Sequence, residues 1–250
     1  MRLKADSKYQ DILILADFSD GSWHATNFAM QFLHHEDSTV SILQTYKSPG
    51  WGHFTMRKLP YTLRKITKYE LKQLKNKLLS NFPIRKSRVK TLSMEGELNS
   101  VLQFKPFFKT EYFITLGIYS SFLDSCNRQN NCLEELIDTT HHPLFILPGE
   151  FDKNPDKKIS FVGNPDKIPS QLLIQQILKI CKTTESSLEV LFVLSNGIQK
   201  VSNEVLNYYI ENFRSVDYEI KQLHGETKCG GIKEHIRNKT KDLLVIENSN

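Results

Sequence analysis

Short apolar runs alternate with amphipathic helical segments along this chain, and this alternation restricts its fold more than any other feature. The run at residues 12–16 has the length of a buried parallel strand, and Gly21 marks the turn after it. Ser19 or Asp20 can cap the helix that follows. Strands joined by helices run in the same direction and form a parallel sheet with right-handed crossovers. The sequence therefore predicts an α/β fold.

The first half of the chain contains five such apolar runs. We expect strands at residues 12–16, 40–46, 88–94, 112–116 and 144–147. A long helix precedes the third strand, and its apolar stripe is expected to face the sheet: Leu63, Ile66, Leu71, Leu74 and Leu78. Residues 149–158 are polar, contain a proline and have no periodicity, which is typical of a linker.

The second half repeats the same order of elements. We expect strands at residues 159–162, 188–194, 218–223 and 242–247, with helices between them. The glycine loop, last helix and fifth strand of the first half have no counterpart after residue 247. The pattern predicts a tandem duplication, with one domain at residues 1–150 and a truncated second domain at residues 151–250.

Two segments of the first half resemble the universal stress protein family. Residues 11–33 read DILILADFSDGSWHATNFAMQFL, and family members open on a strand that ends in a similar Asp-Phe-Ser turn. Residues 111–148 match a strand, a Gly-x2-Gly-x9-Gly-Ser/Thr loop, a helix and a closing strand. The resemblance implies two adenine-nucleotide-alpha-hydrolase-like (Rossmann-like) open parallel sheets in the strand order 3-2-1-4-5, with the second lacking strand 5.

The resemblance also implies a nucleotide site, which is degenerate in this chain. Asp17 matches the carboxylate that meets the adenine or ribose, and Gly117 matches the first glycine of the phosphate loop. Ser120 stands at the second glycine, and Asn130 and Asn131 stand where Gly-Ser/Thr is expected. Glycines let the backbone approach an anion, so their loss weakens the loop. We therefore expect no cofactor, and ATP or AMP bound in domain 1 is the alternative.

The favoured interpretation is a non-enzymatic stress-response or regulatory protein that resembles universal stress proteins and acts through protein contacts. The first alternative is an ATP- or AMP-binding member that uses domain 1, with slow ATP hydrolysis left open. No catalytic residue or metal ligand is expected, because the histidine pairs and cysteines lack ligand spacing. The P-loop-like run at residues 225–233 has Gly231 at the lysine position, so we interpret it as an ordinary strand-to-helix turn.

A basic segment at residues 57–90 supports the second alternative, a polyanion or nucleic-acid binder. It holds twelve Lys or Arg residues and one acid, Glu70, whereas the whole chain has a net charge of +5. Lys65, Lys68, Lys72 and Lys75 are expected to point away from the leucine stripe. Tyr61 and Tyr69 stand almost alone among these cations. We therefore favour a solvated helix face and do not expect nucleic acid as a partner.

The apolar strand at residues 242–247 would be a sheet edge in the truncated domain, and bare edges promote aggregation. Residues 144–147 of the same chain are the favoured cover, which would join the halves into an intramolecular pseudo-dimer. The same strand of a second copy is the alternative, which would make a homodimer. A cytoplasmic location is expected, because no export segment or membrane-length apolar run is evident and the cysteine spacing suggests no disulfide framework.

Overall fold

The structure is a computed structural model that describes residues 10–47, 59–103, 112–118, 132–148, 157–194, 200–225, 227–236 and 242–248. It divides into two compact units, Met1–Leu116 and Gly117–Asn250. The domain boundary after residue 150 was inferred from the repeated order of elements in the sequence. The division into these two units does not test it, and it stays a prediction. None of the described helices has the length and apolar character that crossing a membrane requires.

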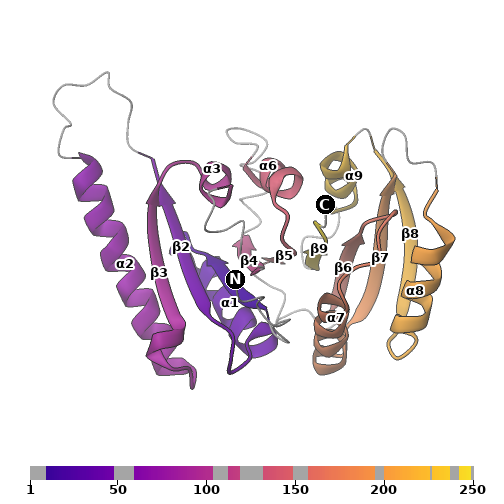
Figure 1. Ribbon diagram of the computed structural model, residues 1–250, viewed down its shortest axis with the longest axis horizontal. Helices are drawn as coiled ribbons and strands as arrows, with labels where there is room; N and C mark the ends of the chain where they lie inside the picture. Colours follow the sequence, from indigo (N-terminus) through magenta and orange to yellow (C-terminus); the bar gives the residue numbers. More distant parts are fainter. Residues whose placement is uncertain are drawn as a thin grey trace, which may run out of the picture. The chain divides into compact units, whose positions relative to one another are not determined.

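The first unit contains a parallel sheet, which confirms the α/β class (Figure 1). Its strands lie in the spatial order β3 (Val89–Glu95), β2 (Val40–Tyr46), β1 (Asp11–Leu15) and β4 (Tyr112–Ile118). The described helical segments are α1 (Asp20–Phe28), the π-helical turn η1 (Ala29–Leu33), α2 (Leu59–Asn81), the short 3-10 turn η3 (Lys86–Arg88) and α3 (Leu98–Leu102). The strand β1 is buried along almost its whole length, as a central parallel strand must be.

Helix α2 packs on β2 and β3, but with a different phase from the one expected. Thr67, Leu71 and Leu78 are buried, whereas the side chain of Ile66 is 53% exposed. The prediction for Ile66 is wrong because a helix turns about 100° per residue, which rotates Ile66 away from the row of Thr67 and Leu71. Lys75 was expected on the outer face, yet it is half-buried and its ammonium donates to the carbonyl of Val89.

The second unit contains a mixed sheet in which parallel pairs predominate. Its strands lie in the spatial order β8 (Tyr218–His224), β7 (Ser187–Leu194), β6 (Lys158–Gly163), β9 (Leu243–Ile246) and β5 (Leu144–Pro148). The described helices of this unit are α6 (Cys132–Thr139), α7 (Gln171–Thr184), α8 (Asn203–Phe213) and α9 (Lys228–Ile236). The strand β8 ends at His224 and α9 begins at Lys228, so the described part of the P-loop-like run lies between a strand and a helix and continues into the helix.

The strand β9 is paired along both of its edges. It runs parallel to β6 and antiparallel to β5, and Val245 stands level with Phe161 on one side and Phe145 on the other. All four residues of β9 are buried. The prediction that residues 144–147 of the same chain cover this apolar strand is therefore confirmed.

Aromatic side chains make up much of the core of the second unit. Tyr209 and Phe213 of α8 pack against Phe161 and Phe192 of the sheet, with ring centroids 5.2–6.4 Å apart. Gly163 ends β6 directly beneath Tyr209, and a Cβ atom at this position would collide with the tyrosine hydroxyl. The absence of a side chain at this position therefore leaves room for the buried Tyr209 hydroxyl.

Candidate functional site: the switch points of the two sheets

Each sheet has a switch point, a pair of neighbouring strands from which the chain connections lead in opposite directions along the sheet. Open α/β folds bind ligands at this point, outside the carboxyl ends of the strands. In the first unit this point lies between β1 and β4, where Leu15 pairs with Leu116. Asp17 stands two residues after Leu15, and Gly117 directly follows Leu116. The structure therefore places both of these expected site residues at the ligand-binding edge of the fold.

The carboxylate of Asp17 is engaged in a tight turn that starts α1. Its Oδ1 accepts hydrogen bonds from the backbone N–H of Ser19, at 2.9 Å, and from the Ser19 hydroxyl, at 2.5 Å. Between them, Phe18 has a φ of 62°, a left-handed conformation that non-glycine residues rarely adopt. Ser19 in turn caps α1 by accepting from the N–H of Ser22. Asp17 thus stabilises the turn, while its side chain stays exposed.

The remaining residues of the expected nucleotide site lie outside the part of the chain that the structure describes. These are Ser120, Asn130 and Asn131, the positions of the second glycine and of the Gly-Ser/Thr pair. The expectation that they form a degenerate phosphate loop stays a prediction.

The switch point of the second unit is occupied by a cluster of the chain's own polar groups. Glu247 directly follows β9, and its side chain is almost fully buried. Its Oε2 accepts hydrogen bonds from the backbone N–H of Asn164, at 3.3 Å, and from the Tyr209 hydroxyl, at 3.4 Å. The ammonium of Lys228 donates to the Glu247 carbonyl, at 2.8 Å, and to Oδ1 of Asn248, at 2.7 Å. We call these five residues the Glu247 cluster.

Burial shifts the pKa values of the Glu247 cluster. It lowers the pKa of Lys228 from 10.5 to about 8, an effect that the negative charges of Glu247 and Asp138 oppose. It also raises the pKa of Tyr209, and the neighbouring Glu247 carboxylate raises it further. The phenol therefore stays protonated and donates to Glu247. The sequence analysis did not predict this cluster, although a glutamate at the end of an apolar strand run was a visible signal.

The shifted pKa of Lys228 leads to a testable prediction about stability at alkaline pH. Between pH 8 and 10.5 the unfolded chain binds more protons at Lys228 than the folded chain, so this group makes the free energy of unfolding rise with pH. We therefore expect the free energy of unfolding of wild type to rise with pH across this window relative to that of Lys228→Met, which lacks the titrating group. Urea denaturation at pH 7, 8, 9 and 10 measures it, with Lys167→Met as an exposed control. Parallel profiles for wild type and Lys228→Met would contradict the buried position of this ammonium.

A second buried carboxylate lies between two strands and α9. Glu189 of β7 is fully buried, and its Oε1 lies 2.5 Å from the Lys221 ammonium of β8. Its Oε2 lies 2.7 Å from Nε2 of His235 and accepts a hydrogen bond from the Ser160 hydroxyl at 3.3 Å. A nucleophilic triad needs the hydroxyl on the imidazole. Here the hydroxyl bonds the carboxylate instead, so this arrangement ties α9 to the sheet.

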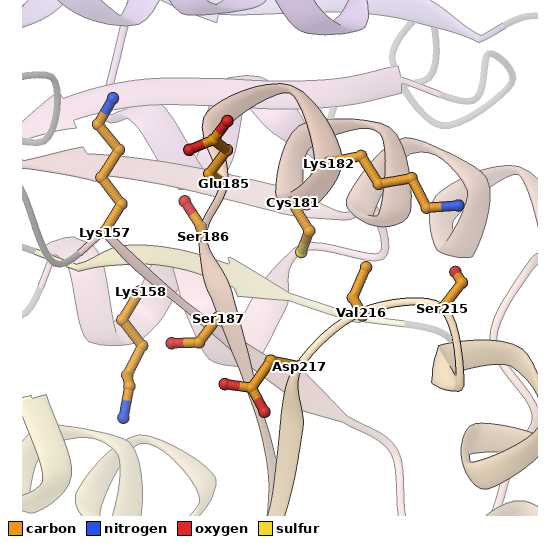
Figure 2. Close-up of a pocket in the computed structure, with 10 residues that line it drawn as sticks. All are labelled: Lys157, Lys158, Cys181, Lys182, Glu185, Ser186, Ser187, Ser215, Val216 and Asp217. Atoms are coloured by element: carbon orange, nitrogen blue, oxygen red, sulfur yellow. The ribbon is translucent and has the colours of Figure 1, made fainter.

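A pocket of about 480 Å³ opens at the amino ends of the strands of the second unit, opposite to the switch point (Figure 2). Lys157 and Lys158 lie on one side of it and Lys182 on the other. Burial raises the pKa of the Cys181 thiol to about 12, so this cysteine is not a nucleophile at neutral pH. Among the described residues, no three His, Cys, Asp or Glu side chains are grouped as a metal site.

Comparison with known proteins identifies the fold of the chain. No family model matches the chain, and no curated protein sequence matches it. A universal stress protein from Archaeoglobus fulgidus has a similar structure, with a TM-score of 0.59 and 10% identity over 96% of both chains. The cytoplasmic domain of a prokaryotic cation chloride cotransporter has a TM-score of 0.47 and 11% identity, also over 96% of both chains. The first similarity shows that this chain has the fold of a universal stress protein.

Proposed function

We propose that this protein is a regulatory protein of a stress response, similar to universal stress proteins, that acts through contacts with other proteins and carries out no chemistry. The observation that supports this most is the Glu247 cluster at the switch point of the second unit. The carboxylate of Glu247 is buried there among its own partners, and a negative charge at this position would repel the phosphates of a nucleotide.

The first unit supports the same proposal with the turn at Asp17. The carboxylate accepts two hydrogen bonds from Ser19, so it has a structural role that needs no ligand. The site at this switch point is accordingly proposed to be degenerate. The cytoplasmic location expected from the sequence belongs to this proposal as well.

The pairing of β9 also bears on how the protein assembles. Because β5 of the same chain occupies the outer edge of β9, that edge is closed to a second copy. We therefore propose that the chain forms no homodimer through β9, and that the duplicated halves associate as an intramolecular pseudo-dimer.

One alternative retains an observation in its favour, namely a protein that binds ATP or AMP in domain 1 and hydrolyses ATP slowly. Asp17 is exposed and follows the carboxyl end of β1, the end of a parallel strand at which open α/β folds bind ligands. The Asp17 carboxylate could accept a hydrogen bond from a ribose hydroxyl if one of its two hydrogen bonds from Ser19 were broken.

Thermal unfolding with ATP distinguishes the two functions. A ligand stabilises the folded chain by RT ln(1 + [L]/Kd), so we expect millimolar ATP to raise the melting temperature by less than about two degrees. Asp17→Ala is expected to leave this small shift unchanged, and Asp20→Ala serves as the control for the nearby charge. We also expect acid extraction of the purified protein to release no stoichiometric adenine nucleotide.

A large ATP effect would reverse the proposal. If millimolar ATP raises the melting temperature by several degrees, and Asp17→Ala but not Asp20→Ala removes the shift, domain 1 is a nucleotide site. Asn131→Ala should then weaken ATP binding as well, because Asn131 stands where the family has a hydroxyl donor.

A further inference from the structure

The outer face of α2 carries the two most exposed large apolar side chains of the described part of the chain. Tyr61 is 67% exposed and Tyr69 is 60% exposed. They stand eight residues apart on one helix, a separation of about 12 Å along the helix axis. Their rings therefore offer two separate apolar surfaces to solvent along a single helix.

Positive side chains line the same face. Arg64, Lys65, Lys68 and Lys72 are all exposed, and within the described part of the chain none of them pairs with a carboxylate. Lys65 lies 5.7 Å from the ring centroid of Tyr61, so one cation lies beside one of the rings. The other two lysines of α2 are already engaged: Lys75 donates to Val89, and Lys77 lies over the ring of Trp23.

Helical geometry brings these groups into one band. Residues 61, 65, 68 and 72 follow the spacing of four, three and four that keeps side chains in line on a helix, and Tyr69 lies directly beside that line. The one acid of α2, Glu70, is half-buried on another side of the helix. We call the band of Tyr61, Arg64, Lys65, Lys68, Tyr69 and Lys72 the α2 face.

We propose that the α2 face binds single-stranded nucleic acid. Proteins that bind single strands without sequence preference combine cations for the phosphates with exposed aromatic rings on which bases stack. The α2 face presents both kinds of group within one band. An acidic protein partner fits less well, because three of the four cations are lysines, and lysine is depleted at the cores of protein interfaces.

The binding of a fluorescein-labelled dT20 oligonucleotide to the full chain, followed by fluorescence anisotropy at increasing salt, tests this proposal. We expect the double variant Tyr61→Ala/Tyr69→Ala to bind at least about tenfold more weakly, since stacking contributes ~1–3 kcal/mol per base. Tyr61→Phe/Tyr69→Phe should bind like wild type because it keeps both rings. Lys65→Ala/Lys68→Ala should reduce the salt slope by up to about 1.4, or about 0.7 for each phosphate that a lysine no longer neutralises.

Matched controls separate this surface from general charge attraction. Lys167→Ala/Lys200→Ala removes two exposed lysines of the second unit and should leave binding and salt slope unchanged. All substituted side chains are exposed, so circular dichroism should confirm that every variant is folded. The proposal is overturned if dT20 does not bind at low salt. It is also overturned if the Tyr→Ala variant binds like wild type, or if polyglutamate of equal charge competes as well as dT20, which would indicate an acidic protein partner.

Discussion

Val245→Pro is expected to abolish soluble, folded protein rather than to lower its stability by a small amount. Val245 is fully buried in β9, between Phe145 of β5 and Phe161 of β6. Proline removes the backbone N–H and fixes φ, and it is tolerated in sheets only at edges or bulges. A proline here would interrupt a strand that is paired on both sides, and it would leave the apolar edges of two neighbouring strands unpaired.

The soluble fraction after expression and the circular dichroism spectrum measure this effect. Val245→Ala is the matched control, because it shortens the same side chain and keeps the backbone donor. We expect Val245→Ala to remain soluble and folded with a reduced melting temperature. A soluble Val245→Pro protein with the wild-type spectrum would show that β9 is not a paired, central strand.

Glu189→Ala is expected to lower the free energy of unfolding by about 2–4 kcal/mol, because it removes the buried carboxylate that joins two strands and a helix. The side chains of Lys221, His235 and Ser160 would all lose their shared partner. Urea denaturation at neutral pH measures the change. Glu189→Gln should lose less, because the amide keeps the shape and one acceptor oxygen.

Glu219 provides the control for this prediction. It also lies on β8 and pairs with Lys221 and Lys158, but it is exposed, and surface pairs contribute ~0–1 kcal/mol. Hydrogen bonds from Lys221 and then Lys158 hold the pKa of Glu219 below its usual value. We therefore expect Glu219→Ala to have a small effect. If Glu189→Ala unfolds at the same urea concentration as wild type, the buried carboxylate does not hold α9 to the sheet.

The fold class was predictable from the sequence because it depends on short apolar runs and their spacing. The cover of β9 by β5 was predictable for a similar reason, since an apolar strand such as LLVI cannot remain a bare edge. The phase of α2 was not predictable in full. Thr67 is buried and Ile66 exposed, and the sequence favours the opposite arrangement until the contacts with β2 and β3 fix the rotation of the helix.

The candidate sites were less predictable than the fold. Asp17 and Gly117 were found because they follow strand runs and match a family pattern. The Glu247 cluster was missed because its members lie far apart in the sequence and because two of its contacts involve the backbone. The backbone N–H of Asn164 donates to the Glu247 carboxylate, and the Lys228 ammonium donates to the Glu247 backbone carbonyl. Backbone groups leave no mark in a pattern of side-chain types, so only the folded chain shows these contacts.

The position of β9 also constrains the order in which the second unit can form during synthesis. The ribosome produces β5 and β6 about 80 residues or more before β9, yet β9 lies between them in the finished sheet. Until residues 243–246 emerge, β5 and β6 each have an edge that is not yet paired with β9. Strand pairs with such a long separation in the sequence form slowly. The nascent chain is therefore vulnerable to aggregation while residues 164–242 are being synthesised, and a chaperone that holds it during this interval should increase the soluble yield.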